Sequence, residues 1–173
     1  MTHFHASFVF LFALNLVSFR WESHPNVGGK IKDFLGKSKF GVQLNPLSVR
    51  LQSNNNQVAI RRLIIPRTPE LLDPLFQFMK EVKDKPYTNS AVELMLAGGS
   101  GRFGVNKPHL DHLFCSGLVA EAYQRMGLLD TKLASNNYSP GDFTTINLSK
   151  GYLEPEVYIK RYYNKHKKGY DLE

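Results

Sequence analysis

Residues 113–129 read LFCSGLVAEAYQRMGLL, and this stretch says most about the fold. Its apolar residues recur at helical spacing, which predicts a helix from about Phe114 to Met126 with Gly127 as its C-cap. Cys115 then lies in the first turn, where backbone N–H groups lack intrahelical acceptors and the helix dipole is positive. Both features lower the pKa of a thiol, and the same N–H groups can bind an oxyanion. The position suits a nucleophile for acyl transfer, and it suits a buried structural cysteine equally well.

The segments around this helix predict an α+β fold with a mainly antiparallel sheet. Thr68 is expected as the N-cap of an amphipathic helix that begins at Pro69 and ends near Asp84. Another helix is expected over 89–97, because two glycines follow it. Strands are expected at 17–21, 41–44 and 58–65, loops at 26–39 and 52–57, and a strand or short helix at 152–163. Strands thus come before, between and after the helices in one domain spanning 1–173.

The composition sets limits on function without choosing one. The chain has 173 residues, a net charge of +7 and one cysteine, so it can bury a core but form no internal disulfide. The charge favours acidic partners. Much of it lies in a basic tail, 158–173, which is interpreted as a solvated terminus; contact with a membrane surface is the alternative, and a nucleic-acid interface is less expected.

The apolar run at 6–19 has two interpretations. It is too short to cross a bilayer as a helix. It suits one or two buried strands, or the apolar part of a signal peptide, although no Lys or Arg precedes it. A cytoplasmic location is favoured under the first interpretation and secretion under the second.

An ordered set of short motifs resembles a known enzyme family. The segments are FCSGLVA at 114–120, Tyr123, GLL at 127–129 and SPGDF at 139–143, preceded by WES at 21–23, GVQLNPL at 41–47 and VAIRRL at 58–63. They are similar to the permuted papain-like amidases of the YaeF/YiiX type, which are grouped with cysteine peptidase family C92 in the NlpC/P60 superfamily. The similarity covers about residues 17–145.

This resemblance implies a circularly permuted papain-like fold and a cysteine-dependent hydrolase or acyltransferase. Its substrate would be an amide or ester, such as a peptide or lipid, and no cofactor is implied. In the family the histidine base comes first, a polar residue that orients it comes next, and the cysteine comes last. Cys115 matches the nucleophile and Glu22 the polar residue. The family has Glu where Gly117 stands here, which implies an altered contact behind the nucleophile.

The histidine is the open position in this scheme. His5 begins an apolar strand that would form a hairpin with the strand bearing Glu22, and it is the preferred base over His24. The alternative is an N-terminus that lacks the true histidine, which would make the chain an inactive homologue that binds a ligand or partner. Tyr87 matches a Pro-Tyr element of the family and is expected, with Ser116, to contact substrate.

Two other patterns are weaker. GSGRFG at 99–104 fits a dinucleotide-binding motif literally, but it lies after a helix rather than between a strand and a helix. His109, His112 and Cys115 have the spacing of metal ligands, yet no fourth ligand is evident, so no metal is expected.

Overall fold

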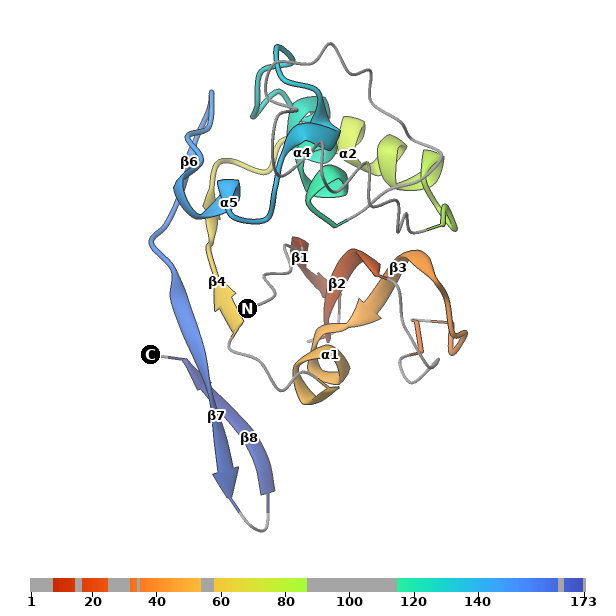
Figure 1. Ribbon diagram of the computed structural model, residues 1–173, viewed down its shortest axis with the longest axis vertical. Helices are drawn as coiled ribbons and strands as arrows, with labels where there is room; N and C mark the ends of the chain where they lie inside the picture. The colour runs from red at the N-terminus through yellow and green to blue at the C-terminus, as the bar shows by residue number, and fades with distance from the viewer. Residues whose placement is uncertain are drawn as a thin grey trace.

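A computed structural model describes residues 8–14, 17–24, 32–33, 35–53, 58–86, 115–164 and 167–172. Figure 1 shows helices α2 and α4 side by side over a sheet of strands β1, β2 and β3. A long hairpin of β7 and β8 extends away from the helices at the lower left of the view. All strand pairs among the described residues are antiparallel. The protein is therefore α+β, as its sequence predicts.

The first sheet has the order β1-β2-β3 and forms the floor of the core. Strand β1 spans Phe8–Leu14, β2 Val17–His24 and β3 Gly41–Pro46. Phe8 pairs with Trp21, so the hairpin expected from the apolar run is confirmed. Helix α1, Leu47–Ser53, follows β3 directly and packs against β2 and β3. The sequence did not predict α1, and the loop expected from residue 52 is wrong at 52–53.

Two longer helices cover the sheet and supply most of the core. Helix α2 spans Pro69–Glu81 and α4 spans Cys115–Arg125, and both confirm the predicted helices. The Trp21 ring meets the Phe78 ring edge-on at 5.7 Å between centroids, which joins β2 to α2. The buried core consists of Trp21, Val42, Leu71, Leu75, Phe78, Val82, Leu118, Val119, Ala122, Tyr123, Met126, Leu128 and Leu129.

Gly127 ends α4 in the way its sequence predicts. Its φ of +68° is left-handed, which glycine adopts without steric cost. The N–H groups of Gly127 and Leu128 donate to the carbonyls of Gln124 and Tyr123, at 3.0 and 2.8 Å. These two bonds form a Schellman cap and satisfy carbonyls that the helix leaves open. The chain can therefore turn sharply and bury Leu128 under the helix.

The single strand predicted over 58–65 is wrong, because the chain changes partner halfway along. Strand β4, Val58–Ile60, pairs with β7, whereas β5, Leu63–Ile64, pairs with β6, Tyr152–Leu153. Pro155 lies between β6 and β7 on the partner side and cannot donate to a ladder. The Arg61 guanidinium fills the break by donating to the carbonyls of Phe143, Thr144, Leu153 and Glu154, at 2.8–3.3 Å.

The basic C-terminal residues belong to a hairpin rather than to an extended tail. Strand β7, Val157–Asn164, pairs with β8, Lys167–Leu172, and β4 adds to the outer side of β7. Two short helical turns, η2 at Ser135–Asn137 and α5 at Asp142–Thr145, precede this hairpin. The helix predicted over 89–97 lies outside the described residues. Within the described part of the chain, no helix combines the length and apolar character needed to span a bilayer.

Candidate functional site

Helix α4 places Cys115 as its first residue. The side chain is 7% exposed, and every residue from Cys115 to Tyr123, Gly117 included, is buried. The first N–H groups of the helix point toward its N-terminal end without helical acceptors. Next to the cysteine, the Ser116 hydroxyl is fully buried and has no hydrogen-bond partner among the described residues. Because Ser116 is 0% exposed, its hydroxyl does not face solvent, and its contact with substrate stays a prediction.

Strands β2 and β3 carry a buried polar face. Arg20 lies opposite Asn45 and Glu22 opposite Gln43, so all four side chains point to the same side of the sheet. Glu22 is 2% exposed. One of its carboxylate oxygens accepts a hydrogen bond from the Asn45 amide at 2.6 Å, and the other lies 3.2 Å from Nε of Arg20. The fold therefore holds a carboxylate in the interior in a fixed orientation, which is the property a residue that orients a base requires.

The sequence singled out Glu22 but missed its two partners. Arg20 and Asn45 are about 25 positions apart along the chain, and only the β2–β3 register brings them to one carboxylate. The alternation of the two strands offered a signal, since polar residues at 20 and 22 and at 43 and 45 face one way while Trp21 and Leu44 face the other. A polar stripe of this kind in a sheet that is apolar on its other face indicates a buried network.

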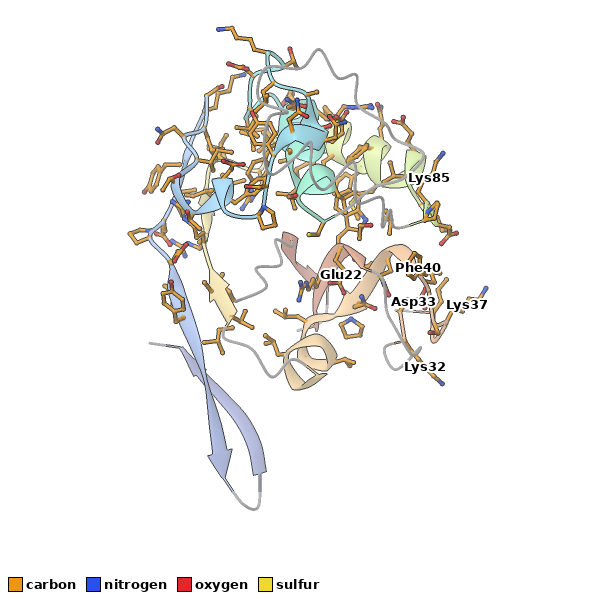
Figure 2. The ribbon with its side chains drawn as sticks, in the orientation of Figure 1. Glu22, Lys32, Asp33, Lys37, Phe40 and Lys85 are labelled. Carbon is orange, nitrogen blue, oxygen red and sulfur yellow. The ribbon has the colours of Figure 1, made fainter. Side chains whose placement is uncertain are left out.

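Helix α4 packs against β2 on the face of the sheet that carries Trp21. Trp21 anchors the core side of β2, and Glu22 leaves the strand on the opposite side. Figure 2 shows Glu22 on β2, in the region below the start of α4. His5 and Tyr87 lie outside the described residues, and of His24 only the backbone, paired in β2, is described.

The alternative sites fall mostly outside the described chain. The glycine-rich segment 99–104 and the histidines 109 and 112 are not among the described residues. Within the part that the structure describes, no group of three His, Cys, Asp or Glu side chains could hold a metal ion.

The second half of α4 is supported by the SPGDF motif. The Asp142 carboxylate accepts hydrogen bonds from the backbone N–H and the hydroxyl of Ser139, both at 2.8 Å, which closes the turn before α5. Phe143 then packs against the rings of Tyr123 and Tyr138, at 6.3 and 6.2 Å between centroids. The motif therefore holds the C-terminal end of α4 in place, whereas the Cys115 thiol lies at the N-terminal end of the same helix.

Burial of the Tyr123 hydroxyl gives the protein an alkaline limit. Desolvation raises the pKa of Tyr123 to about 12, although the charges of Arg67 and Arg61 oppose this change. In the unfolded chain the same tyrosine loses its proton near pH 10, whereas in the folded protein it stays protonated up to about pH 12. The folded state therefore keeps its full stability below about pH 10 and loses stability relative to the unfolded state as the pH rises from 10 to 12. We expect the free energy of unfolding to fall by about 2.7 kcal/mol across that range from this group alone.

Denaturant unfolding at several pH values between about 9 and 12 tests this expectation. In a Tyr123→Phe variant the alkaline loss should shrink by about that amount, whereas Tyr152→Phe, at an exposed position, should leave it unchanged. Equal pH profiles for the wild type and Tyr123→Phe would contradict the prediction.

Comparison with known proteins places the chain in no family. No protein-family model, no curated protein and no solved structure matches it.

Proposed function

We propose that this protein is a cysteine-dependent hydrolase or acyltransferase with a permuted papain-like fold, acting on an amide or ester bond. The observation that carries the proposal is the position of Cys115, at the first residue of a buried helix that packs against the strand bearing the buried carboxylate of Glu22. The motif resemblance assigns nucleophile and orienting residue to these same two positions.

The environment of each group supports its assigned role. The first turn of α4 offers a thiolate the positive end of the helix dipole and N–H donors. Glu22 contacts Arg20 and Asn45, and in the proposed site its carboxylate would also accept a hydrogen bond from an imidazole N–H. The polar face of β2 and β3 thus provides a fixed acceptor, and the histidine that it orients would be His5.

The proposed reaction is acyl transfer in two steps. The Cys115 thiolate attacks the carbonyl carbon, and the N–H groups of the first turn of α4 stabilise the oxyanion. The C–N or C–O bond then breaks, and the protonated histidine gives its proton to the leaving amine or alcohol. Water, or a second acceptor, then attacks the thioester carbonyl while the histidine removes a proton from the attacking group. The C–S bond breaks, and the leaving thiolate takes that proton back from the imidazolium, which restores the free thiol. No oxidant or metal takes part.

The alkylation rate of the thiol tests the proposal, because Cys115 is the only cysteine and every labelled molecule carries the label there. Iodoacetamide labelling is followed from about pH 5 to 9, and the midpoint gives the thiol pKa. We expect a pKa well below the unperturbed value of about 8.5. His5→Ala should raise it, since the imidazolium partner is lost, and His24→Ala provides the matched control that should not.

A second measurement reports on the acyl-enzyme itself. Incubation with a p-nitrophenyl ester should release nitrophenol in a burst and add one acyl group to the protein, detectable by mass spectrometry, and Cys115→Ala should do neither. A thiol pKa near or above about 8.5 in every variant, together with no acylation, would exclude the enzyme. The protein would then be a binding module.

A further inference from the structure

The molecule carries a lysine-rich surface with exposed apolar side chains, away from the candidate site. It consists of the turn at residues 32–40 and the turn that follows α2 at residues 82–85, and is called here the lysine turn surface. A cavity of about 280 Å³ lies between the two segments, lined by Leu35, Lys37, Lys39, Phe40, Val42, Lys83 and Asp84. Figure 2 shows the labelled Lys32, Lys37 and Lys85 on the same side of the molecule.

The turn is held rigidly by its own backbone contacts. The Asp33 carboxylate accepts hydrogen bonds from the N–H groups of Leu35 and Lys37, at 2.9 and 2.8 Å. The Asp33 N–H donates to the Lys37 carbonyl at 2.8 Å, and Gly36 takes a φ of +74°. Lys32 and Ser38 close the base with a β-bridge. The tip of the turn is thus fixed before any partner arrives, so that little conformational entropy is lost on docking.

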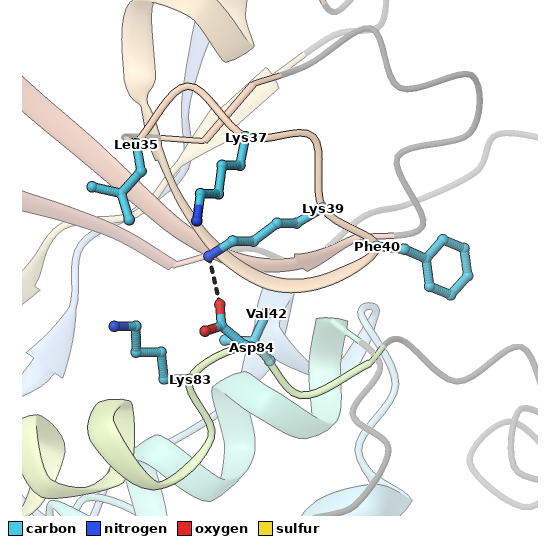
Figure 3. A pocket seen from close by; sticks show the side chains of 7 residues that line it. All are labelled: Leu35, Lys37, Lys39, Phe40, Val42, Lys83 and Asp84. Carbon is cyan, nitrogen blue, oxygen red and sulfur yellow. Dashed lines mark hydrogen bonds and ion pairs between the residues drawn. The ribbon is translucent and has the colours of Figure 1, made fainter.

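The acidic groups of this surface are already neutralised. Lys39 forms ion pairs with both Asp33 and Asp84, which joins this turn to the turn that follows α2 (Figure 3). Its hydrogen bonds to Asp84 and Asp33 raise the pKa of Lys39. Burial raises the pKa of Asp33, but the hydrogen bonds from Lys39 and the backbone outweigh it and lower the pKa overall. Both carboxylates are therefore charged and paired at neutral pH.

The remaining lysines give the surface an excess of positive charge. Five lysines at 32, 37, 39, 83 and 85 face two aspartates, so the net charge is +3. Lys37 and Lys83 are exposed, and within the described chain neither comes within ion-pair distance of a carboxylate. A net positive charge with two exposed lysines, Lys37 and Lys83, attracts an anionic surface.

Two large apolar side chains project from the same turn. Leu35 is 59% exposed and Phe40 is 48% exposed. Figure 3 shows Phe40 directed away from the lysines and Leu35 at the opposite side of the cavity. An exposed leucine on the side of Lys37 and Lys83 matches the boundary of an anionic bilayer, where ammonium groups meet lipid headgroups and an apolar group reaches the acyl chains.

We propose that the lysine turn surface docks this protein onto anionic lipid bilayers, with Lys37 and Lys83 at the headgroups and Leu35 inserted beneath them. The charge complementarity selects a polyanionic partner, and the exposed Leu35 side chain selects a lipid surface over a soluble polyanion. The inference is independent of the chemistry at Cys115, because none of its residues belongs to that site.

Co-sedimentation of the full chain with phosphatidylcholine vesicles, with and without phosphatidylserine, tests the proposal. We expect binding only to vesicles that contain phosphatidylserine. Because each lysine near an anionic surface contributes a factor of about five, Lys37→Gln combined with Lys83→Gln should weaken partitioning by roughly 25-fold. Leu35→Ser should weaken it by about tenfold without changing the charge. These positions are exposed, so all variants should retain the wild-type unfolding temperature.

Two matched double variants separate this surface from the general charge of the protein. Lys132→Gln with Lys150→Gln removes two exposed charges elsewhere, and Lys167→Gln with Lys168→Gln removes two from the basic hairpin. Both should bind vesicles nearly as well as the wild type. The proposal would be overturned if the hairpin variant lost binding and the turn variant kept it. It would also be overturned if Leu35→Ser had no effect, or if soluble polyglutamate bound as tightly as vesicles.

Discussion

Replacing Glu22 by alanine is expected to lower the free energy of unfolding by about 3–5 kcal/mol, one of the largest effects of any single change in this protein. The carboxylate is 2% exposed and lies 3.2 Å from Nε of Arg20, which is itself buried. Without it, the buried guanidinium loses this counter-ion, and the Asn45 amide loses its acceptor. Denaturant unfolding followed by circular dichroism measures the difference.

An exposed ion pair supplies the control for Glu22. Glu154 pairs with Arg62 at 3.1 Å, with side chains 38% and 68% exposed, so Glu154→Ala should cost less than about 1 kcal/mol. Glu22→Gln tests the charge without changing the shape of the side chain, because an amide is as large as a carboxylate but neutral. A variant that keeps most of its stability and loses activity would tie the charge of Glu22 to function. If Glu22→Ala cost as little as Glu154→Ala, the polar face of β2 and β3 would have to be hydrated, and its proposed role in orienting a base would fail with it.

Gly41→Ala is expected to destabilise the fold by roughly 4 kcal/mol, by a purely steric route. Gly41 begins β3 with a φ of +136°, and a Cβ there would lie 2.1 Å from the Lys85 carbonyl oxygen and 2.8 Å from Cα of Pro86. The Val42 N–H donates to that same carbonyl at 2.9 Å, so the segment cannot move away without losing this bond. Thermal unfolding of the variant should show a large drop in midpoint temperature.

Gly36→Ala is the control that separates the cost of a positive φ from the cost of the steric clash at Gly41. Gly36 also has a positive φ, +74°, but a Cβ added to it would meet nothing within 4 Å. Only the conformational cost of about 1 kcal/mol remains there. Similar losses for Gly36→Ala and Gly41→Ala would mean that the crossing of β3 by residues 85–86 is looser than its hydrogen bond indicates.

Local patterns predicted the elements whose causes are local. Helix α4 was evident from its apolar spacing and its terminal glycine, and α2 from the proline at its first position and its apolar face. The division of 58–65 into two strands was not predictable in this way. It depends on Pro155, nearly one hundred residues later, and on an arginine whose carbonyl acceptors come from a distant loop.

The candidate site divides in the same manner. Cys115 was identified because a helix start changes the chemistry of a thiol locally, whichever fold surrounds it. Arg20 and Asn45 were missed because their roles arise from strand register, which a single sequence specifies only weakly. The lysine turn surface was not predictable from the sequence either, because Lys83 and Asp84 meet the turn only after α2 has packed.

The burial of α4 on all its faces has a consequence for sequence divergence. An ordinary surface helix exchanges about half of its residues freely during evolution, since only one face packs. From Cys115 to Tyr123, α4 has no such face, and each replacement there must fit a close-packed interior. Substitutions at these nine positions are therefore expected to be tolerated less often than those on a helix with one face in solvent.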